Sequence, residues 1–140
     1  MALFVLDTDH VTLLQRGHPR VLDRFNAKSE AEVAASVVTY EEQLRGRLAV
    51  IKQSDSAERL ATAYLRLREM HEFFCAIRLM DFGAEAALIY ERLRSEHRRL
   101  GALDLRIAAT ALVSQGTLVT RNRRDFAMIP DLQLDDWSSV

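Results

Sequence analysis

The sequence contains a single cysteine, Cys75, among its 140 residues. One cysteine cannot form an internal disulfide, and its scarcity suits a reducing compartment. A membrane-spanning helix needs about 18 apolar residues in a row, and no apolar run in this sequence is nearly that long. The N-terminal stretch also lacks the basic segment and long apolar run of a signal peptide. We therefore expect a cytoplasmic protein without a membrane segment. Apolar neighbours from Phe73 to Ile77 predict that the Cys75 thiol is a small core group rather than a reactive one.

Lysine and net charge are scarce as well. Lys28 and Lys52 are the only lysines, the rest of the 19 basic residues are arginines, and the formal net charge is -1. A charge so close to zero predicts no strong general attraction to nucleic acid, so the distribution of charge matters more than its sum. Arginine suits phosphate and carboxylate groups, although a high-GC genome produces the same bias.

No internal repeat, low-complexity tract or linker interrupts the chain, and its length suits one domain, 1–140. Short apolar runs alternate with segments of helical periodicity. This alternation predicts an α/β/α domain, in which helices cover both faces of a parallel sheet of about five strands. The predicted strands cover residues 3–6, 33–38, 77–80, 117–120 and 132–134. The longer predicted helices cover 39–51, the stretch from the polar residues around Ser54 to about Phe74, 83–99 and 104–115.

Acidic or amide side chains lie where the predicted strands end or the next helices begin. In a parallel sheet these positions form one edge, where ligands usually bind. Each group also has a purely structural interpretation as a helix cap or a first-turn acid, with Thr39 and Glu42 matching a capping box. Capping does not explain why several segments bring acids to one edge. The residues concerned are Asp7, Asp9, Glu41, Glu42, Asp104, Asn122 and Asp125.

Carboxylates that gather at one edge repel one another, which raises their pKa values unless a cation binds between them. Oxygen ligands without cysteine or histidine favour Mg²⁺ or Mn²⁺ over zinc. The four histidines are scattered, and His71 is predicted to be a core residue on an apolar helix face. A carboxylate-bound divalent cation promotes attack on phosphorus and stabilises the resulting charge. The residues alone therefore predict a metal site that acts on phosphate esters.

Several segments, in order along the chain, resemble motifs of the PIN-domain family, and in particular its VapC toxins. The segments are VLDTDHVTLLQRG, SVVTYEEQLRG, GALDLRIAATAL, LVTRNRRDF and the final LQLDDW. The resemblance assigns the metal-binding and catalytic acids to Asp7, Glu42 and Asp104, with Glu42 rather than Glu41 in the second motif. Many family members have an aspartate where this chain has Asn122. Because an amide is a weaker ligand, Asp125 and Asp9 are further candidates beside Asn122.

The resemblance also implies an activity and partners. It implies a Mg²⁺- or Mn²⁺-dependent endoribonuclease that forms a homodimer and is inhibited by a small antitoxin encoded beside it. A structured RNA such as tRNA is the favoured substrate. Arginines near the predicted edge are candidates for contacting the RNA backbone. They are Arg121, Arg123, Arg124 and Arg106, with Arg98 and Arg99 as further candidates.

Two other functions compete with this interpretation. Asp7-Thr8-Asp9 also matches the Asp-x-Asp motif of haloacid-dehalogenase-like phosphatases, in which Asp7 would be a nucleophile. Those enzymes, like receiver domains, need a downstream lysine, and this chain has none after Lys52. A PIN-like module that binds RNA or a partner without cutting is the second alternative, favoured by the neutral Asn122.

The segment from 39 to 74 carries more apolar residues than one sheet face needs. We expect part of this surface to be buried in a dimer or against a helix of the antitoxin. The residues concerned include Leu44, Leu48, Leu60, Leu65 and Phe73.

Overall fold

The computed structural model describes residues 2–140 and has one parallel sheet of five strands in the order β3-β2-β1-β4-β5. The sheet confirms the predicted α/β/α class. Its strands are β1 (Phe4–Leu6), β2 (Val33–Ser36), β3 (Arg78–Met80), β4 (Thr117–Val119) and β5 (Gln133–Asp135). Because Val5 pairs with Ala34 on one side and Leu118 on the other, β1 lies at the centre of the sheet.

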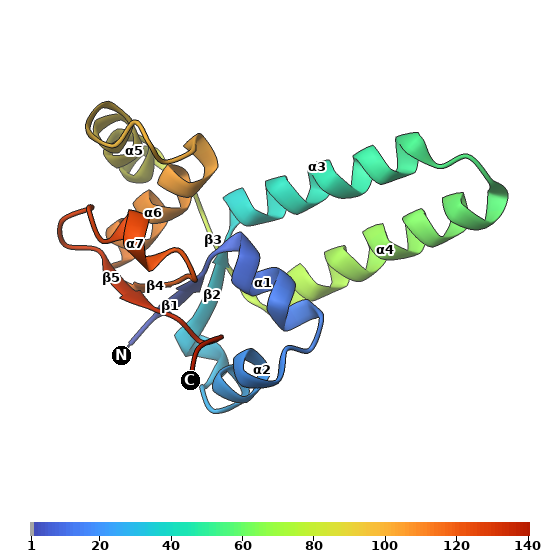
Figure 1. Cartoon of the computed structure of the whole chain (residues 1–140), viewed down its shortest axis with the longest axis horizontal. Helices are drawn as coiled ribbons and strands as arrows, with labels where there is room; N and C mark the ends of the chain where they lie inside the picture. The colour runs from blue at the N-terminus through green and yellow to red at the C-terminus, as the bar shows by residue number, and fades with distance from the viewer. Residues whose placement is uncertain (1) are drawn as a thin grey trace.

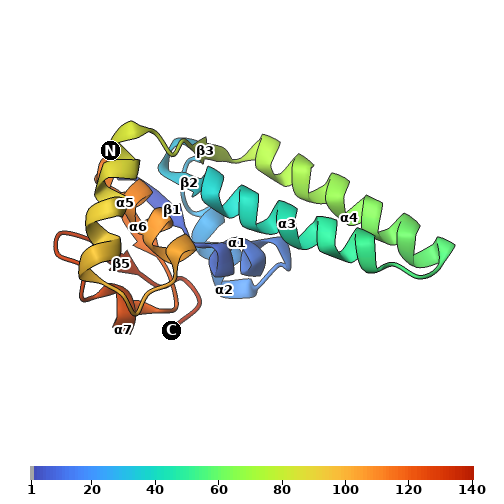
Figure 2. The same ribbon diagram turned by 90° about the horizontal axis from the view of Figure 1, so that it is seen from above.

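Helices cover both faces of the sheet (Figures 1 and 2). The helices are α1 (Thr8–Gln15), α2 (Pro19–Asn26), α3 (Val37–Gln53), α4 (Ala57–Ala76), α5 (Ala84–Glu96), α6 (Ala102–Ser114) and α7 (Arg123–Phe126), with a 3-10 turn at Glu30–Glu32. Val5 belongs to the core formed with α5 and α6, and Leu6 to the core formed with α1, α2 and α4. This division follows from the alternation of side chains along a strand. Within residues 2–140, no helix combines the length and apolarity that crossing a membrane requires.

Helix α6 is buried almost all round, as its apolar pattern predicted. It ends at Gln115, whose φ of 55° is left-handed, and Gly116 follows. A Cβ on Gly116 would lie 3.1 Å from the carbonyl oxygen of Leu3, so the close approach to the first strand favours glycine here. The buried body of α6 therefore fixes the position of Asp104 in its first turn.

Helices α3 and α4 pack on each other and project from the body as a two-helix arm (Figures 1 and 2). The arm explains the surplus of apolar residues only in part. Leu44 and Phe73 pack against the core at its base. Leu48, Leu60 and Leu65 are 51%, 40% and 57% exposed.

The arm also overturns two predictions for α4. Cys75 and His71 are both exposed rather than core residues, and their side chains contact each other at 3.5 Å. The buried residues of α4 are Ala63, Met70 and Phe74. An amphipathic pattern shows that a helix has an apolar face, but not how much of that face finds a core to pack against.

The alternative interpretation of Thr39 and Glu42 as a capping box does not hold in the structure. Strand β2 ends at Ser36, two residues earlier than predicted, and α3 begins at Val37. The Ser36 hydroxyl accepts a hydrogen bond from the Val38 N–H at 3.0 Å, so Ser36 is the helix cap. Thr39 is buried inside the helix, and Glu42 is free from a capping role.

Candidate functional site

Asp7 lies at the carboxyl end of the central strand. Its backbone N–H donates to the carbonyl of Val119 at 3.0 Å, which places it beside the end of β4. Its carboxylate caps α1 by accepting the His10 N–H at 2.8 Å, and the residue is only 7% exposed. Asp7 is therefore both a helix cap and a nearly buried acid at the edge of the sheet.

Hydroxyl contacts join the neighbouring elements at this edge. Thr8 and Thr39 share a hydrogen bond of 3.0 Å, which links the start of α1 to α3. Ser36 and Thr110 share one of 3.3 Å, which links the start of α3 to α6. These contacts hold together the helices that carry Asp7, Glu42 and Asp104.

Asp104 is half-buried in the first turn of α6, close to the other predicted acids. Burial raises the pKa of Asp104 above its ordinary value, and repulsion from Asp7, Glu42 and Asp125 raises that pKa further. Four elements thus bring acids within electrostatic range of one another, which the pattern of strand ends had predicted. Within residues 2–140, no hydrogen bond or ion pair engages the carboxylates of Glu42, Asp104 or Asp125.

The tightest group differs from the predicted one. Across the part of the chain that the structure describes, one set of three acidic or histidine ligand atoms lies within 4.8 Å of one another, and it comprises Asp7, Asp9 and His10. Asp7, Glu42 and Asp104 are not as close as this. Arg121 already binds Asp9 through Nε at 2.6 Å and Nη2 at 2.9 Å. Asp9 is therefore less available to a cation than the three unpaired acids.

His10 is the residue that sequence analysis missed. It is fully buried, and its Nδ1 lies 3.3 Å from the Asp7 carboxylate. The backbone N–H of Trp137 donates to His10 Nε2 at 3.2 Å. Because Nε2 accepts this hydrogen bond, we assign the ring proton to Nδ1, where it points to Asp7. The buried His10 ring thus fixes the position of the Asp7 carboxylate from the protein interior.

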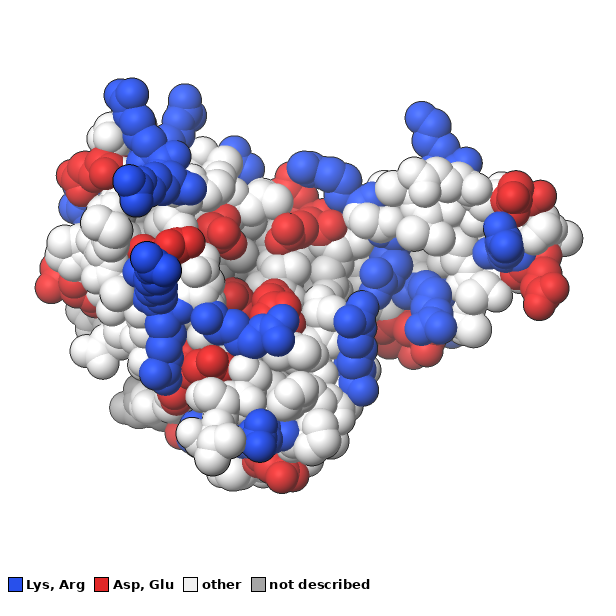
Figure 3. Space-filling model, in the orientation of Figure 1, with Lys and Arg blue, Asp and Glu red and all other residues white. Residues whose placement is uncertain are grey.

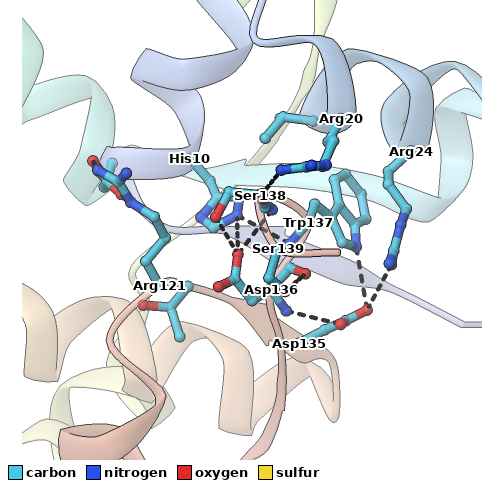
Figure 4. A network of polar contacts seen from close by, with 12 residues as sticks. His10, Arg20, Arg24, Arg121, Asp135, Asp136, Trp137, Ser138 and Ser139 are labelled. Atoms are coloured by element: carbon cyan, nitrogen blue, oxygen red, sulfur yellow. Dashed lines mark hydrogen bonds and ion pairs between the residues drawn. The ribbon is translucent and has the colours of Figure 1, made fainter.

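Asp136 lies beside this network, with its carboxylate 3.4 Å from His10 Nε2 (Figure 4), although a nitrogen that accepts the Trp137 N–H has no proton to donate to it. Burial acts to raise the pKa of Asp136, but hydrogen bonds from the hydroxyl and the N–H of Ser138 outweigh it and lower that pKa. The position of His10, three residues after Asp7 on one helix, offered a sequence clue to their contact. Its contact with Trp137, 127 positions away, offered none.

The arginines predicted to contact RNA have several partners within the protein. Arg121 binds Asp9, Arg123 lies 3.3 Å from Asp135, and Arg106 stacks over Tyr90 at 5.0 Å. Arg124 is exposed and has no ion pair within residues 2–140. Asn122 begins α7, but its side chain makes no capping hydrogen bond.

The donors at this edge fit a hard divalent cation. Asp7, Glu42, Asp104 and Asp125 offer only carboxylate oxygens, the ligands that such cations prefer. Both nitrogens of His10 are engaged, by Asp7 and by Trp137, so histidine is not an available ligand. A cation among these acids would relieve the repulsion that raises the pKa of Asp104.

Comparison with known proteins identifies the family to which this fold belongs. The tRNA(fMet)-specific endonuclease VapC of Salmonella typhimurium is 26% identical over 142 residues, which cover 98% of this chain and 99% of that protein. Ribonuclease VapC2 of Rickettsia felis is 36% identical over 69 residues, which span 46% of this chain and about half, 52%, of that protein. The crystal structure of DNA-bound VapBC from Salmonella typhimurium superposes with a TM-score of 0.75 at 26% identity, covering 98% of this chain and 99% of that one. The family model of the PIN domain matches residues 4–132, and the chain belongs to the PIN-domain family.

Proposed function

We propose that this chain is a metal-dependent endoribonuclease toxin that is neutralised by an antitoxin protein, with residues 1–140 acting as one nuclease domain. The observation that carries the proposal is the position of Asp104, whose pKa is raised by burial and by Asp7, Glu42 and Asp125. Unpaired acids from separate elements, gathered at the carboxyl edge of a PIN-type sheet, are suited to hold a cation against a phosphodiester. A phosphatase that uses Asp7 as a nucleophile fits less well, because no lysine follows Lys52.

Asp7, Glu42 and Asp104 are the residues we propose to hold the cation, which we propose to be Mg²⁺ or Mn²⁺. When bound, such a cation supplies an activated water and stabilises negative charge on the phosphate. His10 orients the Asp7 carboxylate, and Glu42 either binds the cation or orients water beside it. Asp125 is the better fourth candidate, because Asn122 is neutral and Asp9 is paired with Arg121.

The proposed substrate is RNA, and the proposed partners are a second copy of the chain and an antitoxin. The name of the Salmonella relative supports a tRNA substrate, and its VapBC structure supports a bound partner protein. Exposed apolar residues of the arm, such as Leu48 and Leu65, support burial against one of these partners. We propose a cytoplasmic location, which suits a chain whose one cysteine is free and exposed.

A metal titration with an RNA cleavage assay tests this function. Protein stripped with EDTA is incubated with total bacterial RNA while Mg²⁺ or Mn²⁺ is added back, and the new RNA ends are sequenced. We expect cleavage only with added metal, at a restricted set of sites. Binding of RNA without any cleavage at saturating metal would instead support the non-catalytic module that the neutral Asn122 favours.

A further inference from the structure

A groove separates α1 from the arm and begins at the acidic edge. Its inner end is lined by Thr8 and Glu42, and its volume is about 480 Å³. The groove is lined along its length by Arg16 on one side and by Arg47 and Arg66 on the other. We call this groove, from Thr8 and Glu42 to these three arginines, the arm groove. Figure 3 shows basic side chains around the hollow where the arm leaves the body.

The arginines of the arm fall into two sets. Those outside the groove are neutralised by an acid four positions away on the same chain. The pairs are Arg45 with Glu41 at 2.7 Å, Arg59 with Asp55 at 3.1 Å and Arg68 with Glu72 at 3.0 Å. Within residues 2–140, no carboxylate forms an ion pair with Arg16, Arg47 or Arg66. The fold therefore leaves the three arginines of the groove without ion-pair partners among the described residues, while Glu42 at the inner end is the one acid that lines it.

Arg47 adds a second, independent observation. Its Nε is buried and has no hydrogen-bond partner within the described part of the chain. A buried N–H without an acceptor is unfavourable, and native proteins satisfy such groups with a partner. The groove nearby contains the amides of Gln15 and Gln43, but these bind each other through two hydrogen bonds of 2.9 Å. Because Nε is covered, an anionic oxygen from a ligand could satisfy it only after the Arg47 side chain shifts toward the groove.

We propose that the arm groove binds the phosphodiester backbone of the RNA on one side of the cleaved bond, an inference that rests on the proposed nuclease function. A strand whose reacting phosphate lies near Glu42 must continue past that residue, and the groove begins there. Guanidinium groups bind phosphate oxygens in a two-pronged geometry, and unpaired cations along a groove are typical of single-strand binding surfaces. RNA fits better than an acidic peptide, because the groove is continuous with the proposed cleavage site.

Steady-state cleavage kinetics test the groove with two single-stranded RNAs. One RNA has about 12 nucleotides, enough to extend from the cleavage site into the groove, and the other has about 4 and stops short of it. These two lengths lie within the usual range of binding-site sizes for single-stranded nucleic acids. The variants are Arg47→Gln and Arg66→Gln. The matched controls are Arg45→Gln and Arg68→Gln, each two positions away on the same helix.

For the longer RNA, we expect each groove variant to raise KM about tenfold and to leave kcat unchanged. The reason is that the lost contact between arginine and phosphate is equally strong in the bound substrate and in the transition state. The slope of log kcat/KM against log salt should become shallower by about 0.7 for each lost phosphate contact. The controls should behave as wild type on both RNAs, and the groove variants as wild type on the shorter one. A merely structural role for the arginines would not change the salt slope.

The outcomes distinguish a failure of the proposed nuclease function from a failure of the groove proposal. The two RNAs carry a sequence that the protein cleaves in total bacterial RNA, and if the wild type cleaves neither these RNAs nor total bacterial RNA in any metal, the proposed function is wrong. If it cleaves both and the groove variants keep wild-type KM and salt slope, the groove does not bind RNA. Unchanged RNA kinetics with lost binding of a poly-glutamate peptide would overturn the groove proposal and identify a protein-docking surface. Arg66 is exposed, so Arg66→Gln keeps the test valid if Arg47→Gln fails to fold.

Discussion

The two halves of the acidic edge are built differently. On the β1 side, Asp7 is hydrogen-bonded to His10 and Asp9 is paired with Arg121, so both carboxylates are fixed by the protein itself. On the α3 and α6 side, Glu42 and Asp104 have no such partner within residues 2–140, and burial together with repulsion from neighbouring acids raises the pKa of Asp104. In the proposed function, the fixed half would determine where a cation binds, and the unpaired half would supply the negative charge that attracts it.

Asp7→Asn should show the largest effect on activity. The amide keeps the shape and can still cap α1, but removes a full negative charge, so we expect cleavage to fall by about 10²–10³-fold. Metal-free stability should change by less than about 1 kcal/mol, because asparagine is an equally good cap. Cleavage in Mg²⁺ and thermal melting in EDTA measure the two effects. A destabilised but fully active variant would mean that Asp7 is only a cap.

His10→Leu should affect both stability and metal binding. It leaves the buried N–H of Trp137 without an acceptor, which costs about 1–3 kcal/mol. It also frees the Asp7 carboxylate, and loss of such a supporting group typically weakens metal affinity by about 10–100-fold. Denaturant unfolding and Mg²⁺ titration are the measurements. Leu93→Ala, a buried change in α5, is the control, and equal loss of Mg²⁺ affinity in both variants would remove the specific role of His10.

Asp104→Asn tests the unpaired half through pH. Because the folded-state pKa of Asp104 is raised above 3.8, its contribution to stability is complete below that value and is lost as pH rises through the folded-state pKa. We therefore expect metal-free Asp104→Asn to melt at a higher temperature than wild type at neutral pH and to lose less stability between acid and neutral pH. Mg²⁺ should stabilise the wild type more than the variant. Identical melting profiles from pH 3 to pH 8 would show that Asp104 is not strained by its neighbours.

Arg121→Gln should have the smallest effect. Its ion pair joins side chains that are 53% and 44% exposed, so stability should change by less than about 1 kcal/mol. Freeing Asp9 adds uncompensated negative charge beside Asp7, and Mg²⁺ should bind slightly more tightly in a calorimetric titration. Weaker Mg²⁺ binding would mean that Arg121 organises the fixed half rather than masking one of its acids.

The fold and the approximate place of the site could be predicted from the sequence because they depend on local patterns. The apolar run before Asp7 and the all-round apolar pattern after Asp104 indicated β1 and the buried helix α6. The exposure of His71 and Cys75 could not be predicted, because it depends on how far the arm extends beyond the sheet. The role of His10 depends on Trp137, and only the folded chain brings these two residues together.

The separation of His10 and Trp137 also bears on protein synthesis. A ribosome releases Asp7 and His10 early, but the N–H that orients the imidazole emerges 127 positions later. Strand β1 likewise waits for β4 before it is paired on both sides. A nascent chain therefore carries Asp7 and Glu42 long before it can hold Asp7 in place, because domains fold as units once their distant parts are available. The support that holds the Asp7 carboxylate in place can therefore form only after Trp137 has been synthesised.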